Sequence, residues 1–294
     1  MIAYILLGIN CILNAFNTLL TKKFQLGFKT DTIHFVMYNF VGAVIGSIYF
    51  FIASGFKIEM NGITFMFSVI YAASVFLSLV LSIYILSKIS ISLSTITSTA
   101  ASVISASVGG MIFFGEQMSL QHIVSAILVL AAVIIPYGKL VKTGFKKESI
   151  WACIIYFCYI CVAGLITKFY TRAEGVCNSV SWFFMTNLIL VVVCGIFAVC
   201  YAFKKHEKIG KVLCTLTPGQ LGNLAVRTAI NNISSVMNVV ILTTMALSVC
   251  SVISSSAGLV LSALMSRFIF KESLPRENKI GVALAVAAVI VSSL

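Results

Sequence analysis

The chain is divided into ten apolar stretches, and nearly all of its charged residues lie at the breaks between them. The stretches span about residues 2–21, 33–54, 62–86, 90–114, 119–137, 150–168, 178–203, 219–243, 246–270 and 278–294. A helix needs about 20 apolar residues to cross a bilayer, whereas a strand of a membrane barrel needs about 10 with strict alternation. The pattern therefore predicts an all-α integral membrane protein with ten transmembrane helices.

Composition excludes the usual soluble classes. Hydrophobic residues make up 60% of the 294 residues and charged residues only 10%, whereas soluble domains are about 25% charged. The net charge of +12 comes from short basic clusters between the apolar stretches, which indicates membrane orientation and not a nucleic-acid surface. The expected partners are a small-molecule substrate and membrane lipid, with no nucleic acid, and the chain is expected to be a monomer or a weak dimer.

The distribution of Lys and Arg predicts the orientation. Most of the 20 basic residues follow the odd-numbered predicted helices, and the opposite loops hold only Lys57, Lys168 and Arg172. Loops rich in Lys and Arg stay in the cytoplasm. We therefore expect a multi-pass protein of the inner (plasma) membrane with both termini outside.

The two halves of the chain resemble each other. Residues 92–98 match 248–254, Glu116 matches Glu272, and Thr21-Lys22 matches Thr167-Lys168. An ordered set of matches indicates an internal repeat. Because each half holds an odd number of helices, the second half enters the membrane in the opposite sense. The sequence thus predicts two inverted five-helix repeats, residues 1–144 and residues 145–294, as in many secondary transporters.

The chain resembles the drug/metabolite transporter superfamily in two features. One is this repeat, and the other is the Gly115-Glu116 break before the fifth helix, which is matched by Lys271-Glu272 before the tenth. The similarity is to its ten-helix EamA-like members and covers essentially the whole chain. The resemblance implies a metabolite transporter. Members often carry an Arg on the second and seventh helices, where this chain has Asn39 and Asn187.

Polar side chains follow helical spacing along several of the predicted helices. One face of the eighth carries Arg227 with Asn residues, and one face of the first carries Asn10, Asn14 and Asn17. Such residues are costly in a bilayer unless they face protein or a water-filled cavity. Two alternatives remain open: Ser and Thr stripes also serve helix packing, and Arg227 could snorkel to the surface. Tyr38 is expected at the membrane boundary. The predicted substrate-binding residues are Arg227, Asn231, Asn10, Asn14, Tyr71, Ser78, Thr95, Tyr159, Ser234, Asn238, Ser251 and Ser255.

The positions of the acidic residues indicate the charge of the substrate. All eight Asp and Glu lie at or near breaks, so no carboxylate within a span can neutralise Arg227, bind a cationic drug or carry a proton. An Arg in an uncharged cavity favours a carboxylate or phosphate. We therefore expect a secondary transporter, working by alternating access, of a small anionic or zwitterionic metabolite such as an amino acid. The first, third and fourth helices and their mates, the sixth, eighth and ninth, are expected to line the site.

Other functions have less support in the sequence. No G-x-x-x-x-G-K-[ST] loop occurs, so ATP is not expected to drive transport. A channel or a lipid-handling membrane protein remains the alternative. A membrane-embedded enzyme is less favoured, because the chain has no H-E-x-x-H motif and no pair of acids within a span. Cys158 and Cys161 form an isolated C-x-x-C pair, so no metal and no cofactor are expected.

Overall fold

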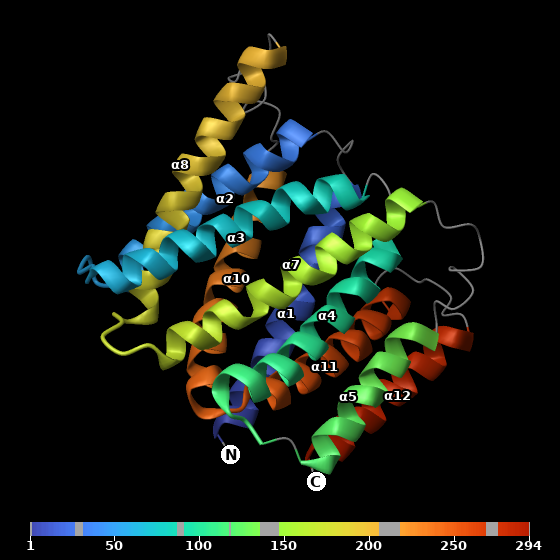
Figure 1. The fold of residues 1–294 in the computed structure, drawn as a ribbon. Helices are drawn as coiled ribbons and strands as arrows, with labels where there is room; N and C mark the ends of the chain where they lie inside the picture. Colours follow the sequence, from blue (N-terminus) through green and yellow to red (C-terminus); the bar gives the residue numbers. More distant parts are fainter. Residues whose placement is uncertain are drawn as a thin grey trace. The chain divides into compact units, whose positions relative to one another are not determined.

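The computed structural model describes residues 2–26, 32–86, 91–117, 119–135, 147–205, 218–268 and 276–293. Within these segments the chain is helical and contains no strand (Figure 1). The prediction of an all-α protein is therefore confirmed, and the helix bounds lie within a few residues of the apolar stretches. The helices are α1 (Ile2–Leu26), α2 (Thr32–Ala53), α3 (Gly62–Leu86), α4 (Ile91–Phe114), α5 (Leu120–Ile134), α7 (Lys147–Arg172), α8 (Ser179–Lys205), α10 (Pro218–Thr244), α11 (Leu247–Phe268) and α12 (Arg276–Ser293).

Several helices have the length and composition of membrane spans. In the described part of the chain, four windows are long and apolar enough to cross a membrane: Val36–Ala53, Ile154–Arg172, Ser179–Lys204 and Pro218–Thr244. Shorter apolar segments occur in the other helices: Ala3–Asn17, Gly62–Ser78, Thr99–Phe114, Leu120–Ala132, Leu247–Leu261 and Lys279–Val291. Large apolar side chains also lie on the outer surface of these helices. Such helices are compatible with a membrane protein.

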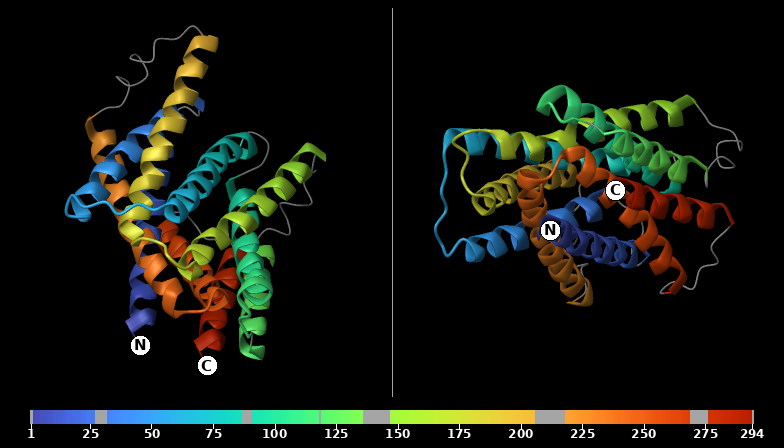
Figure 2. Two further views of the ribbon diagram at one scale, coloured as in Figure 1. Left: turned by 60° about the vertical axis from the view of Figure 1, so that its left-hand side comes forward. Right: turned by 90° about the horizontal axis from the view of Figure 1, so that it is seen from below.

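The described helices belong to two compact units. The first comprises Met1–Ala15, Leu81–Arg172 and Asn238–Leu294. Within it, α4 packs against α7 and α11, and α5 lies along α12, as Figures 1 and 2 show from three sides. Small apolar side chains allow α4, α5, α11 and α12 to approach closely around a core of Val103, Val129, Val252 and Ala288.

The second unit comprises Phe16–Val80 and Ala173–Met237. In this unit α2 lies along α8 (Figure 1), and Val36, Met37, Cys194 and Ala198 form a buried cluster between them. The two helices approach so closely at Gly46 that a Cβ there would lie 2.6 Å from Oδ1 of Asn187 on α8. A side chain at this position would have to displace Asn187, so glycine favours this close contact.

Two helices of the second unit have side-chain caps at their N-terminal ends. Asn61 Oδ1 accepts a hydrogen bond from the backbone N–H of Thr64 at 2.8 Å, and Asn178 Oδ1 accepts one from the N–H of Ser181 at 2.8 Å. Such caps satisfy N–H groups that have no partner within the helix. Asn61 also donates to the carbonyl oxygen of Gly175, so the start of α3 is tied to the segment that precedes α8.

Each compact unit combines segments from both halves of the chain. A unit is defined by contacts, whereas a repeat is defined by sequence likeness. The expected boundary between residues 144 and 145 therefore stays a prediction.

Candidate functional site

A cavity of about 350 Å³ lies within the second unit, between α2, α3, α8 and α10. Its volume is in the range of sites for small molecules, about 300–1,000 Å³. Amide and hydroxyl side chains make up much of its wall, and among the described residues one guanidinium is its only charged group. The lining residues are Tyr38, Asn39, Gly42, Ala43, Tyr71, Val75, Ser78, Asn187, Leu190, Cys194, Leu224, Arg227, Thr228, Asn231, Asn232 and Ser235.

The guanidinium of Arg227 is held from two sides. Its Nε donates a hydrogen bond to Asn17 Oδ1 at 3.2 Å, and its central carbon lies 5.1 Å from the centroid of the Tyr38 ring. Asn17 in turn donates through Nδ2 to Asn231 Oδ1 at 3.1 Å. Among the described residues, the two terminal nitrogens of Arg227 have no hydrogen-bond acceptor. They are left available to a ligand.

Asn232 provides a further donor on the wall of the cavity. Its side chain is 4% exposed, and its Nδ2 has no hydrogen-bond partner among the residues that the structure describes. A buried donor without an acceptor costs about 1–3 kcal/mol. A ligand that brings an acceptor to Nδ2 would recover this free energy.

Aromatic rings lie on one side of the cavity. The ring of Tyr71, a lining residue, is 5.1 Å from that of Trp182 and 6.0 Å from that of Phe183. Trp182 is fully buried. These contacts pack Tyr71 against a buried ring, and the Tyr71 ring itself gives the cavity an apolar surface.

The structure brings together some of the residues that were predicted to bind substrate. Arg227, Asn231, Tyr71 and Ser78 line the cavity. Ser234 lies on the same helix as Arg227 and is buried, but it is not part of the lining. Helical spacing thus correctly placed Arg227 and Asn231, which is one turn later on the same helix, on one shared surface.

Six other predicted residues belong to the first unit and do not line this cavity: Asn10, Asn14, Tyr159, Asn238, Ser251 and Ser255. Asn14 Nδ2 donates to Asn10 Oδ1 at 3.5 Å. The Ser251 hydroxyl donates to the backbone oxygen of Ser248 at 3.0 Å, a bond typical of Ser inside helices. The side chain of Thr95 lies outside the described residues.

Sequence reasoning missed the contribution of α2 and α8. Tyr38, expected at the membrane boundary, is 1% exposed and lies beneath the guanidinium of Arg227. Asn39 and Asn187 both line the cavity. The sequence held a signal for these two residues, because Asn39 and Asn187 occupy matching places in the predicted repeat.

Comparisons with known proteins show the fold and no more. No family model matches the chain, and no curated protein matches it. A solved structure named only "Crystal structure of protein" aligns with a TM-score of 0.73 over 99% of this chain and 96% of that chain. The two sequences are 14% identical, so the likeness shows a shared architecture and says nothing about a ligand.

Proposed function

We propose that the protein is a secondary transporter of small anionic or zwitterionic metabolites, such as amino acids, and works by alternating access. The observation that carries this proposal is the guanidinium of Arg227 in a cavity that no acid of the described residues lines. The full proposal includes ten helices that cross the plasma membrane as two inverted five-helix repeats of the EamA-like kind. The agreement between the helix bounds and the apolar stretches supports it.

The chemistry of Arg227 defines the charge of the substrate. A guanidinium presents paired N–H donors in a planar fork that matches the two oxygens of a carboxylate or phosphate. Asn17 and the Tyr38 ring hold the Nε and the face of this group. The fork is therefore oriented before a ligand arrives, which reduces the entropy lost on binding. Because none of the described lining residues is an acid, the ligand itself supplies the neutralising charge.

The amide groups around Arg227 suit the remaining parts of such a molecule. Asn232 Nδ2 is a buried donor without an acceptor, and it can bind a second oxygen of the ligand. Asn39 and Asn187, from α2 and α8, carry amide oxygens that can accept hydrogen bonds from an ammonium or hydroxyl group. A zwitterion can thus satisfy both kinds of group in one cavity.

A ligand screen followed by uptake tests this proposal. Purified protein is screened by thermal shift against carboxylates, amino acids and phosphate esters, because a ligand that binds only the folded state raises its stability. The compound with the largest shift is then labelled and its uptake measured in proteoliposomes. We expect Arg227→Ala to abolish both the shift and the uptake, and Arg227→Lys to retain part of each because it keeps the charge without the fork.

Arg172 provides the matched control. It is exposed at the end of α7, so Arg172→Ala removes an equal charge and should leave uptake unchanged. The fluorescence of Trp182 reports whether the region around the cavity is folded in each variant. The chain has one other Trp, Trp151, which is 65% exposed and can be replaced by Phe so that only Trp182 emits. Uptake at the wild-type rate in Arg227→Ala protein that folds normally contradicts the proposal. Ion currents far faster than carrier turnover would indicate a channel instead.

A further inference from the structure

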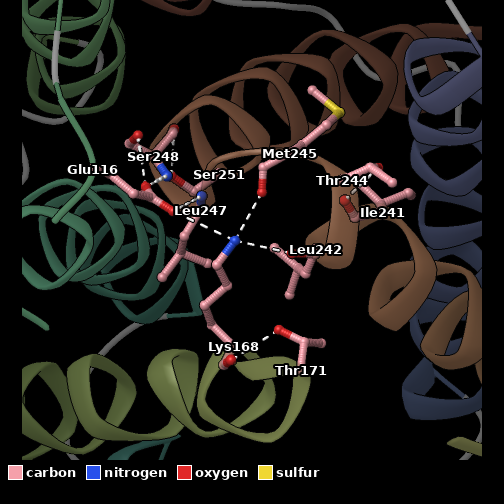
Figure 3. Close-up of polar contacts among 10 residues, drawn as sticks. All are labelled: Glu116, Lys168, Thr171, Ile241, Leu242, Thr244, Met245, Leu247, Ser248 and Ser251. Carbon is pink, nitrogen blue, oxygen red and sulfur yellow. Dashed lines mark hydrogen bonds and ion pairs between the residues drawn. The ribbon is translucent and has the colours of Figure 1, made fainter. Parts of the chain in front are cut away.

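The junction between α10 and α11, residues 242–248, is held by two buried charges of opposite sign. Figure 3 shows the amino group of Lys168, from α7, between the carbonyl oxygens of Leu242 and Met245, at 2.9 and 2.8 Å. The carboxylate of Glu116 accepts hydrogen bonds from the N–H of Leu247 at 2.8 Å and of Ser248 at 3.3 Å. Lys168 Nζ lies 3.4 Å from Glu116 Oε1.

Both charges match the ends of the helices that they contact. The carbonyls at the end of α10 carry the partial negative charge of the helix dipole, and the first N–H groups of α11 carry the partial positive charge. The ammonium therefore lies at the C-terminal end of α10 and the carboxylate at the N-terminal end of α11. Glu116 also precedes α5 in the sequence, but Ser119 caps that helix.

Two glycines near Glu116 allow its carboxylate to reach this position. Gly115 has a φ of 62°, a left-handed conformation that strongly favours glycine. At Gly110, a Cβ would lie 2.6 Å from Glu116 Oε2, so the absence of a side chain there makes room for the carboxylate. Lys168 is 2% exposed and Glu116 7% exposed. The pair is thus enclosed by protein.

The atoms around Lys168 Nζ are those of a cation site. Two backbone carbonyls and one carboxylate oxygen surround the ammonium, and carbonyls at the C-terminal ends of broken helices bind free cations in many membrane transporters. We propose that Leu242, Met245 and Glu116 form a site for a small monovalent ammonium-type cation, which the chain fills with Lys168. The junction is then held without any free ion. This inference does not depend on transport.

Truncation of Lys168 tests the site. In Lys168→Ala the atoms lost beyond Cβ are three carbons and the ammonium, so propylammonium replaces them. We expect the unfolding temperature of purified Lys168→Ala protein in detergent to fall, and to rise again by several degrees in propylammonium chloride but not in tetramethylammonium chloride at equal ionic strength. Propanol, which has the same shape without the charge, should give no comparable rise. Wild-type protein, in which Lys168 fills the site, should unfold at the same temperature in the two ammonium salts.

Two variants separate binding at this site from a general effect of the salt. Lys168→Met fills the space of the side chain without charge and should show no specific response to propylammonium. Adding Glu116→Gln to Lys168→Ala removes the carboxylate and should reduce the response. Equal unfolding temperatures of Lys168→Ala in propylammonium and tetramethylammonium overturn the proposal, as does an undiminished response with Glu116→Gln.

If Lys168→Ala does not survive purification, the same comparison is made at extraction. Membranes that contain the variant as a fluorescent fusion are solubilised in either salt, and the monodisperse fraction is measured by size-exclusion chromatography. A larger monodisperse fraction in propylammonium supports the site. Equal fractions in the two salts count against it.

Discussion

Gly46 on α2 offers a test of the helix contact that forms one wall of the cavity. In Gly46→Ala the new Cβ would lie 2.6 Å from Asn187 Oδ1 and 3.0 Å from its Cγ, whereas ordinary contacts begin at 3.4 Å. Asn187 is restrained, because its Nδ2 donates a hydrogen bond to the backbone oxygen of Phe183 at 2.8 Å. The substitution therefore either breaks this bond or separates α2 from α8.

The expected loss follows from these two outcomes. Overpacking of a helix contact costs about 1–3 kcal/mol, and loss of one hydrogen bond costs about 0.5–1.5 kcal/mol. Gly42, one turn earlier on α2, is the matched control, because its added Cβ would meet Leu224 and Thr228 at ordinary distances of 3.5 and 3.6 Å. Both variants gain the same helix propensity, about 1 kcal/mol. We therefore expect Gly46→Ala to be about 1–3 kcal/mol less stable than Gly42→Ala.

Equilibrium unfolding in lipid bicelles measures this difference. Asn187→Ala removes the obstructing atoms, so in that background Gly46→Ala and Gly42→Ala should have nearly equal free energies of unfolding. The reasoning is refuted if the two single variants are equally stable in the wild-type background. It is also refuted if the difference persists undiminished after Asn187→Ala.

Two further predictions concern the second unit. Tyr38→Leu removes the ring beneath Arg227 and should weaken ligand binding by about 0.5–2 kcal/mol in titrations with the ligand found by thermal shift, whereas Tyr38→Phe should bind nearly as the wild type does. Asn178→Ala removes one helix cap and should cost about 1 kcal/mol of unfolding free energy. Asn61→Ala removes a cap and the bond to Gly175, so it should cost about 0.5–1.5 kcal/mol more. Equal stability of the two Asn variants contradicts this assignment.

Most of the helix bounds could be predicted from the sequence because local signals determine them. The apolar stretches set the lengths, and glycines mark several breaks. Gly55, Gly115 and Gly175 have φ values of 64°, 62° and 72°, a left-handed conformation that interrupts a helix and favours glycine. These signals involve neighbouring residues only, so a single sequence reveals them.

The cavity could be predicted only in part. Arg227 and Asn231 are one turn apart, so helical spacing alone placed them on one face. The hydrogen bond from Arg227 to Asn17 joins two residues that are 210 positions apart along the chain. Spacing within one helix carries no information about which other helix it meets. Tyr38 was therefore assigned to the membrane boundary although it packs against the guanidinium.

The charge pair shows a second limit of sequence reasoning. Lys168 was counted among residues of a loop, and Glu116 was regarded as a residue at a helix break. The structure buries both. A count of charges near helix breaks assumes that each charge is solvated. In the folded chain, the break that carries Glu116 is packed against Lys168, so both charges are buried. Glu272 and the side chain of Lys22, which match Glu116 and Lys168 in the predicted repeat, lie outside the described residues.

The low burial of the candidate spans has a consequence for handling the protein. Only 18–33% of each window is buried inside the protein. If these windows cross a bilayer as proposed, acyl chains cover most of the remaining surface. The 27 residues of α8 extend about 40 Å at 1.5 Å per residue, which exceeds a hydrocarbon core of about 30 Å. Such a helix must tilt or extend beyond the core. Bilayer thickness is then itself a variable of stability, and longer acyl chains should favour the folded protein.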